Sequence, residues 1–168
     1  MPFRPADLKT LKTLKTLLGR AAVWLLPLLF VGLSLPLIDR PGIYNDEALF
    51  GNATFPPYRV LYSAQAFKTQ LPLMVMTYVG TLKAYLAKFV FLWVPPSTVS
   101  VRILPVLLGA VTVALFFLGM RRLWGVRVAG LGALLLATDA TFIMTTRYDW
   151  GPVALQHLLL AGGAVALV

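Results

Sequence analysis

The chain has no cysteine and very few acidic residues. Its 168 residues include six Asp and Glu against fifteen Lys and Arg, for a net charge of +9. Without cysteine, a disulfide framework, a thiol nucleophile and a thiolate metal site are all excluded. Because carboxylates are so scarce, each is a candidate for a specific role, above all Asp46 and Glu47, which are adjacent in the sequence.

Charged residues as a whole are also scarce, and apolar residues take their place. Charged residues make up 12% of the chain and hydrophobic residues 59%, whereas soluble domains carry about 25% charged residues. The basic residues stand mainly at the ends of apolar segments. We therefore interpret them as determinants of membrane orientation and contacts with membrane lipids, and not as a nucleic-acid interface. The composition predicts an integral membrane protein.

Four apolar segments predict about four transmembrane helices. They lie at about 21–38, 103–120, 128–144 and 152–168, and each complete one nearly matches the length that crosses about 30 Å of hydrocarbon. The N-terminal lysines and the turn with Arg121, Arg122 and Arg127 flank these segments. The positive-inside rule places both basic regions in the cytoplasm and the loop 39–102 outside. The last segment has no polar flank, which predicts a longer parent protein whose N-terminal part is 21–168.

The first twenty residues form a basic segment of low complexity. The triplet Leu-Lys-Thr occurs three times between Leu8 and Thr16. On a helix, this spacing gives one leucine stripe and one lysine stripe, as in helices that lie on anionic headgroups. A disordered basic tail has the same composition, so the sequence leaves both alternatives open.

The outer loop contains an apolar stretch, 71–94, that is interrupted by Lys83 and Lys88. Two lysines near the middle are unusual in a transmembrane helix. We therefore predict amphipathic helices at the outer interface, ended by Pro95 and Pro96. A further span is the alternative. The predicted fold is all-α: a polytopic bundle of about four transmembrane helices, with interfacial helices in the first outer loop.

Seven short segments, spread along the chain from about residue 20, carry a family resemblance by their order and spacing. They are Tyr44–Ala48, Leu71–Met74, Tyr78–Lys83, Ser100–Pro105, Arg121–Gly125, Ala133–Thr138 and Asp149–Pro152. Together they resemble the GT-C membrane glycosyltransferases of the family 39 type, which include protein O-mannosyltransferases and lipid A aminoarabinose transferases, although no single motif among them is diagnostic.

The resemblance implies transfer of a sugar from a polyprenyl-phosphate-linked donor to a lipid or protein acceptor, with inversion, on the outer face of the plasma (inner) membrane. Such a displacement needs a base, and a carboxylate in a partly desolvated interface suits this role because burial raises its pKa. The resemblance places Asp46 as this base. Glu47 would hold the acceptor, orient Asp46 or cap a helix beginning at Ala48. From the residues alone, Asp46 as a helix N-cap is an equal alternative.

Recognition of the donor phosphate needs arginine or lysine at the outer interface. Arg102 is our first candidate because it opens the second predicted span in a position similar to the family's. The rest of the predicted donor- and acceptor-binding set is Lys83, Tyr78, Arg147 and Asp149. Snorkelling to headgroups is the alternative role of each cation, and capping of the fourth span is the alternative role of Asp149.

No particular cofactor follows from the sequence, and we predict no metal ligand set, although the resemblance allows a divalent cation. Asp139 lies toward the outer end of the third predicted span, where an acid needs a partner. Two other functions remain open: a non-catalytic membrane subunit or pseudoenzyme, and a transporter fragment. For a transporter, the intramembrane polar residues Asp139, Gln156 and His157 are a thin set.

Overall fold

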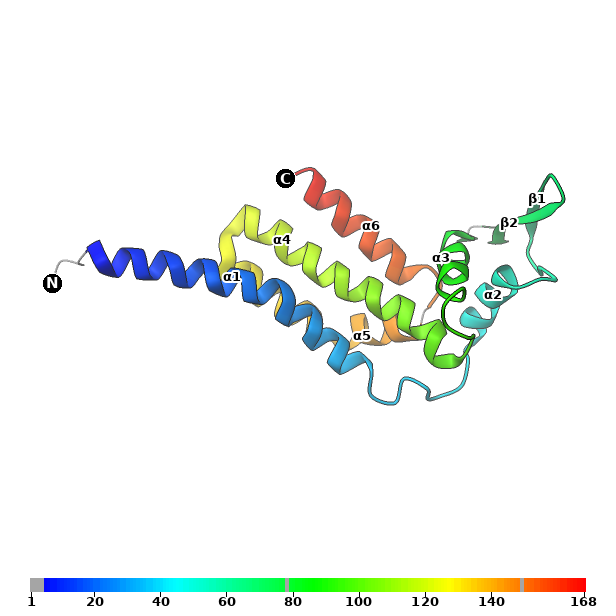
Figure 1. Ribbon diagram of the computed structural model, residues 1–168, viewed down its shortest axis with the longest axis horizontal. Helices are drawn as coiled ribbons and strands as arrows, with labels where there is room; N and C mark the ends of the chain where they lie inside the picture. The colour runs from blue at the N-terminus through cyan, green and yellow to red at the C-terminus, as the bar shows by residue number, and fades with distance from the viewer. Residues whose placement is uncertain (1–4, 78, 149) are drawn as a thin grey trace.

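The computed structural model describes residues 5–77, 79–148 and 150–168. Figure 1 shows an elongated molecule with a helical body and a smaller group of elements at one end. The body contains helices α1 (Pro5–Ser34), α4 (Thr98–Thr138), α5 (Ala140–Arg147) and α6 (Val153–Ala166). The end group contains α2 (Asn45–Thr54), β1 (Tyr62–Ala66), β2 (Thr69–Met76), β3 (Val79–Gly80) and α3 (Leu82–Val90).

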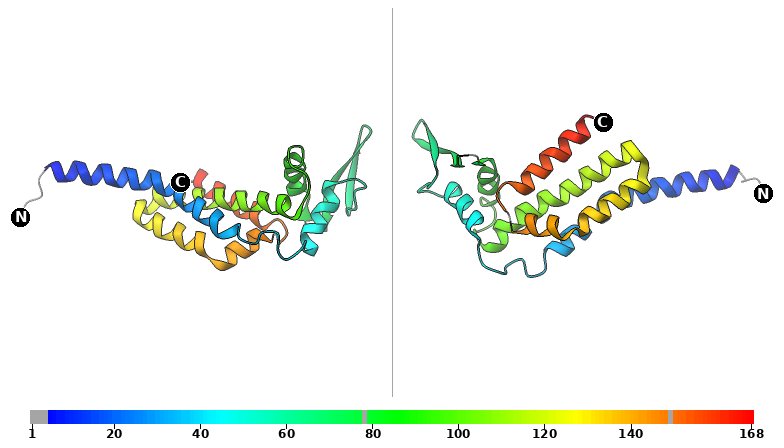
Figure 2. Two further views of the ribbon diagram at one scale, coloured as in Figure 1. Left: turned by 60° about the horizontal axis from the view of Figure 1, so that its bottom comes forward. Right: turned by 180° about the vertical axis from the view of Figure 1, so that it is seen from behind.

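The helical body is held together along α4, which packs against α1 on one side and α6 on another (Figures 1 and 2). Its core consists of apolar side chains such as Phe30, Val113 and Phe117, which are completely buried. A Cβ atom on Gly109 would lie 2.8 Å from ring carbons of Phe30 and from Cγ2 of Thr146. Glycine at this position therefore lets α1 and α5 approach α4 closely.

Helix α4 is divided by Gly125, whose φ of 84° and ψ of 173° are not helical. This backbone region is essentially restricted to glycine. The chain turns here, and the limb 126–138 runs back along the body (Figure 2). The limb ends at Asp139, whose carboxylate accepts a 2.6 Å hydrogen bond from the Phe142 amide and so caps α5. The partner expected for Asp139 is thus a helix amide.

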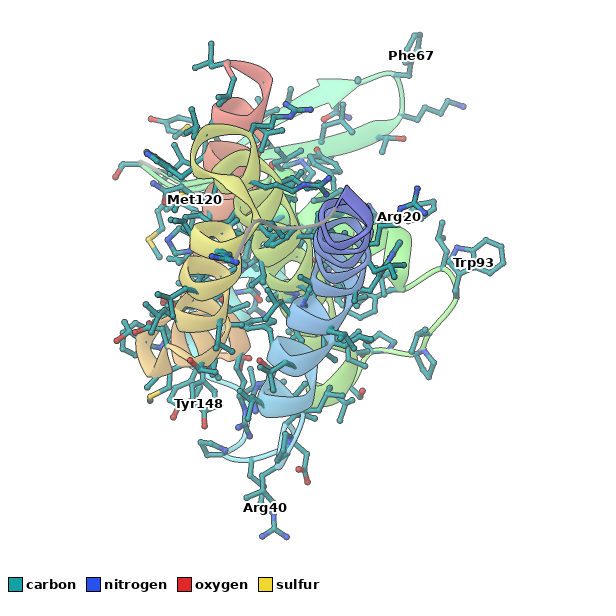
Figure 3. All side chains as sticks on the ribbon, turned by 90° about the vertical axis from the view of Figure 1, so that its left-hand side faces the viewer. Arg20, Arg40, Phe67, Trp93, Met120 and Tyr148 are labelled. Atoms are coloured by element: carbon teal, nitrogen blue, oxygen red, sulfur yellow. The ribbon has the colours of Figure 1, made fainter. Side chains whose placement is uncertain are left out.

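The end group contains a three-stranded antiparallel sheet in the order β1-β2-β3. Pro72 lies in β2 next to a register shift, where Ser63 pairs with Pro72 but Tyr62 pairs with Met74. Proline has no amide hydrogen, and a bulge is one of the few places in a sheet that accept it. The hairpin tip carries Phe67, which is fully exposed. Figure 3 shows Phe67 and Trp93 both extending away from the molecule.

The prediction of an all-α bundle with about four transmembrane helices is wrong. The stretch 71–94 forms most of β2, then β3 and α3, because its run of consecutive apolar residues suits a strand as well as a helix. Within the described residues, only α4 is long and apolar enough to cross a membrane. The first and fourth predicted spans correspond to shorter apolar helical stretches, Gly19–Ser34 and Val153–Ala166. The third is divided at Asp139.

The outward surface of the helical body is nonetheless strongly apolar. No charged residue occurs in 21–38 of α1 and the loop after it, or in 103–120 of α4. Large apolar side chains on α1, both limbs of α4 and α6 are 53–73% exposed, namely Trp24, Leu25, Leu28, Leu107, Leu131, Leu135, Leu159 and Leu160. Exposed apolar surface of this extent marks contact with a membrane or a partner protein. A single long apolar helix also occurs in the cores of soluble proteins.

Candidate functional site

The acid pair lies in the first turn of α2, and its two carboxylates have different surroundings. Helix α2 begins at Asn45, with Tyr44 as its N-cap residue. Glu47 is the third helical residue, and its Oε2 atom accepts a 2.7 Å hydrogen bond from the Tyr44 amide. The N-cap alternative for Asp46 therefore does not hold, nor does the alternative in which Glu47 caps a helix beginning at Ala48. Asp46 is partly buried, whereas Glu47 is 3% exposed.

Glu47 forms a buried ion pair with Arg102. The Arg102 Nε atom donates to Oε1 at 2.6 Å and one terminal nitrogen donates to Oε2 at 2.9 Å, so the contact is bidentate. Both side chains are completely buried. Bidentate geometry of this kind gives the strongest arginine–carboxylate contacts.

The remaining N–H groups of Arg102 donate hydrogen bonds to backbone carbonyl oxygens of the loop before α2. Its terminal nitrogens donate to the carbonyl oxygens of Ile38 at 2.7 Å, Pro41 at 2.9 Å and Gly42 at 2.8 Å. A guanidinium has five N–H donors. The three bonds to the backbone and the two bonds to Glu47 together use all five. Arg102, the first candidate for phosphate binding, thus belongs to an internal network that fixes the loop and α2, and it has no N–H group left for a donor phosphate.

Asp46 lines a cavity of about 240 Å³ between α2 and the sheet of the end group and the turn before α6. Asp46, Leu49 and Phe50 come from α2, Val75, Met76 and Val79 from β2 and β3, and Trp150, Gly151 and Pro152 from the turn before α6. Among these described lining residues, Asp46 is the one ionisable side chain. Trp150 lines the cavity and is 53% exposed. The site therefore combines one carboxylate, one half-exposed aromatic residue and apolar walls.

Lys83 supports two walls of this cavity. Its side chain is almost completely buried, at 3% exposure. The ammonium group donates a 2.8 Å hydrogen bond to the Gly151 carbonyl oxygen and lies 3.4 Å from the centroid of the Phe50 ring. A cation over an aromatic face is attracted by the ring quadrupole. Lys83 thus links α3 both to α2 and to the turn before α6.

Arg147 lies in the last turn of α5 and faces the same loop as Arg102. Its guanidinium donates to the carbonyl oxygens of Leu37 and Arg40 and lies 5.2 Å from the Tyr148 ring. Its Nε atom is buried and has no hydrogen-bond partner among the described residues. Tyr78 and Asp149, the other predicted binding residues, lie outside the described residues. In the described ranges, no group of three or more His, Asp or Glu side chains is arranged to hold a metal ion.

Sequence reasoning missed two features of the site. The first is the pairing of Glu47 with Arg102, which are 55 residues apart. An arginine opening a long apolar helix in an acid-poor chain was a signal for such a pair, because a buried cation requires a partner. The second is Trp150 as a cavity residue, for which the sequence offered no signal beyond the neighbouring acid.

No known protein family, curated protein or solved structure matches this chain. Its function must therefore be argued from the geometry of the site. That geometry favours recognition of a small polar molecule with apolar faces, because largely apolar pockets with few polar groups are typical of such sites.

Proposed function

We propose that this chain is a membrane glycosyltransferase component that transfers a sugar from a polyprenyl-phosphate-linked donor to an acceptor. One observation carries the proposal: Asp46 and the half-exposed Trp150 line the same cavity. Sugar rings offer hydroxyl donors along their edges and C–H groups on their faces. A carboxylate accepts hydrogen bonds from the hydroxyl groups, and an aromatic ring packs against the C–H groups.

In the proposed step, Asp46 accepts the proton of the acceptor hydroxyl as its oxygen attacks the anomeric carbon. The bond between that carbon and the donor phosphate oxygen breaks, and the phosphate leaves with the electron pair. Because a single displacement occurs, the configuration is inverted. Glu47 does not act as a second base, since Arg102 and the Tyr44 amide already occupy both of its oxygens. It positions α2, and therefore Asp46, at the cavity.

The surroundings of the cavity support a lipid-linked donor. The charge-free section 103–120 of α4 is about 27 Å long at 1.5 Å per residue, close to the hydrocarbon thickness of a bilayer. The elements that line the cavity, α2, the sheet and the turn before α6, lie near one end of this section, and the basic turn at 121–127 lies at the other (Figure 1). In our proposal α4 crosses the membrane and the cavity is outside. Arg147, which is partly exposed and three residues before the cavity residue Trp150, would exchange its contacts with the loop carbonyl oxygens for the donor phosphate.

The test is the transfer activity of Asp46→Asn in the native protein and its own membranes. Asparagine keeps the size of the side chain but cannot accept the proton. We expect transfer from sugar-loaded polyprenyl phosphates, extracted from the same membranes, to fall by about 10²- to 10⁴-fold. Asp39→Asn is the matched control, because Asp39 is an exposed acid in the preceding loop, and it should leave the rate unchanged.

Normal turnover by Asp46→Asn would disprove the assignment of the base. A wild-type protein that inserts into the membrane but shows no transfer would favour the non-catalytic subunit instead. Trp150→Ala adds a second readout. Loss of the ring should raise the KM for the sugar-bearing substrate, whereas Trp150→Phe should retain much of the affinity.

A further inference from the structure

The turn in α4, at the end of that helix away from the cavity, gathers arginines from two helices; the N-terminal half of α1 continues beyond it (Figure 1). Arg20 comes from α1, and Arg121, Arg122 and Arg127 come from both sides of the turn in α4. The two helices meet here, since a Cβ atom on Gly19 would lie 3.6 Å from the Arg121 guanidinium. All four arginines are exposed. This end faces the viewer in Figure 3, where Arg20 is labelled. We call these four residues the arginine end.

The arginine end has no acidic counterpart in the described part of the chain. The ion pairs found among the described residues, Arg40 with Asp39 and Arg102 with Glu47, both lie at the other end of the body. Arg122 donates to the Val165 carbonyl oxygen, which holds its side chain against the end of α6. Four cations without carboxylates create a local positive potential that attracts anions.

Apolar and aromatic side chains accompany these charges. Trp124 and Leu123 at the turn are 60% and 52% exposed. Trp124, Gly125, Val126 and Arg127 line an open hollow of about 320 Å³. Tryptophan beside arginine is the composition of a protein surface at the boundary between headgroups and hydrocarbon. The exposed leucines of α1, α4 and α6 continue from this end along the body.

We propose that the arginine end binds the headgroups of anionic phospholipids. The guanidinium groups contact the lipid phosphates, as arginine is suited to do, and Trp124 and Leu123 enter the boundary between headgroups and hydrocarbon. Free nucleic acid fits less well, because the flanking surface is apolar. This inference does not depend on the proposed transferase activity, since it concerns the other end of the molecule.

The experiment measures binding of fluorescent phosphatidylglycerol to the detergent-solubilised protein by polarisation, with fluorescent phosphatidylcholine as the neutral probe. The test variant combines Arg20→Gln, Arg121→Gln and Arg127→Gln, and leaves Arg122 to hold α6. We expect the wild type to prefer phosphatidylglycerol, and the test variant to bind it at least about tenfold more weakly. Raising the salt concentration should weaken wild-type binding.

Two controls keep the inference falsifiable. Arg59→Gln with Lys68→Gln removes exposed charges from the end group and should leave lipid affinity unchanged. Lysine at the three test positions keeps the positive charge, so it should retain most of the electrostatic attraction and bind phosphatidylglycerol more tightly than the glutamine variant does. Equal binding of both lipids, undiminished binding by the glutamine variant, or equal losses in the lysine and glutamine variants would overturn the proposal. Tighter binding of a labelled oligonucleotide than of phosphatidylglycerol would also overturn it.

Discussion

Glu47 and Asp46 are neighbours in the sequence, yet α2 directs them to different tasks. The buried Glu47 accepts from Arg102 and from the Tyr44 amide, so each of its oxygens has a fixed donor. Arg102 also lies 5.3 Å from the ring of Tyr148 and 6.0 Å from that of Tyr44. The two rings meet edge to face at 5.3 Å. Charge, hydrogen bonds and rings together fix the start of α2, and hence the position of Asp46.

Glu47→Ala should strongly destabilise the protein. It leaves Arg102 buried without its carboxylate, and breaking a buried ion pair in this way costs about 3–5 kcal/mol. Thermal unfolding in detergent measures the effect. Asp39→Ala is the control, because the Asp39–Arg40 pair is exposed and should change the midpoint little.

The double variant Glu47→Met with Arg102→Met separates the cost of an unpaired charge from the worth of the pair. Replacing both partners by apolar side chains removes the uncompensated charge, so the double variant should lose less stability than the sum of the single variants. Additive losses would show that the two residues do not act as a pair.

At the scale of secondary structure, the sequence predicted helices correctly where an apolar run was too long for a strand. It located the first limb of α4 and much of α1, and it placed the acid pair next to a helix N-terminus. It failed at β2, since Pro72 argues against a strand and only the bulge beside it makes the strand acceptable. It also joined 128–144 into one span, because a capping aspartate such as Asp139 cannot be distinguished from an intramembrane acid by its neighbours alone.

The turn in α4 depends on one residue, Gly125. Its φ of 84° with ψ of 173° lies in a region that other residues enter at a cost of about 1–3 kcal/mol. Nothing lies within 4 Å of the Cβ position there, so Gly125→Ala should destabilise through backbone strain alone. Thermal unfolding should show a lowered midpoint.

Gly130→Ala is the matched control for this strain. Gly130 lies inside the second limb of α4 and also has open space at its Cβ position. Alanine is favoured over glycine in a helix by about 1 kcal/mol, so this variant should be neutral or more stable. If both variants shifted the midpoint in the same direction, backbone strain at Gly125 would not explain its effect.

At the scale of the whole molecule, the two ends of the body differ in charge and in chemistry. The acid pair and the cavity lie with the end group, the arginine end lies opposite, and charge-free helix separates them (Figure 1). The sequence predicted this difference in charge between the two ends, because the acid pair and the basic turn can be read directly from the positions of the charged residues. The cavity itself was not predictable, since its walls come from α2, the sheet and the turn before α6, which only tertiary packing brings together.

This asymmetry predicts that the two ends lie on opposite sides of a membrane. The chain has no cysteine, so single cysteines can be introduced into the unchanged protein. A membrane-impermeant maleimide should label Gln65→Cys, on exposed β1, in right-side-out vesicles. It should label Arg127→Cys only after permeabilisation, with the other three arginines retained to preserve orientation. Labelling of both cysteines in intact vesicles would show that α4 does not cross the membrane. Labelling of Arg127→Cys alone would place the cavity in the cytoplasm, which would exclude transfer on the outer face.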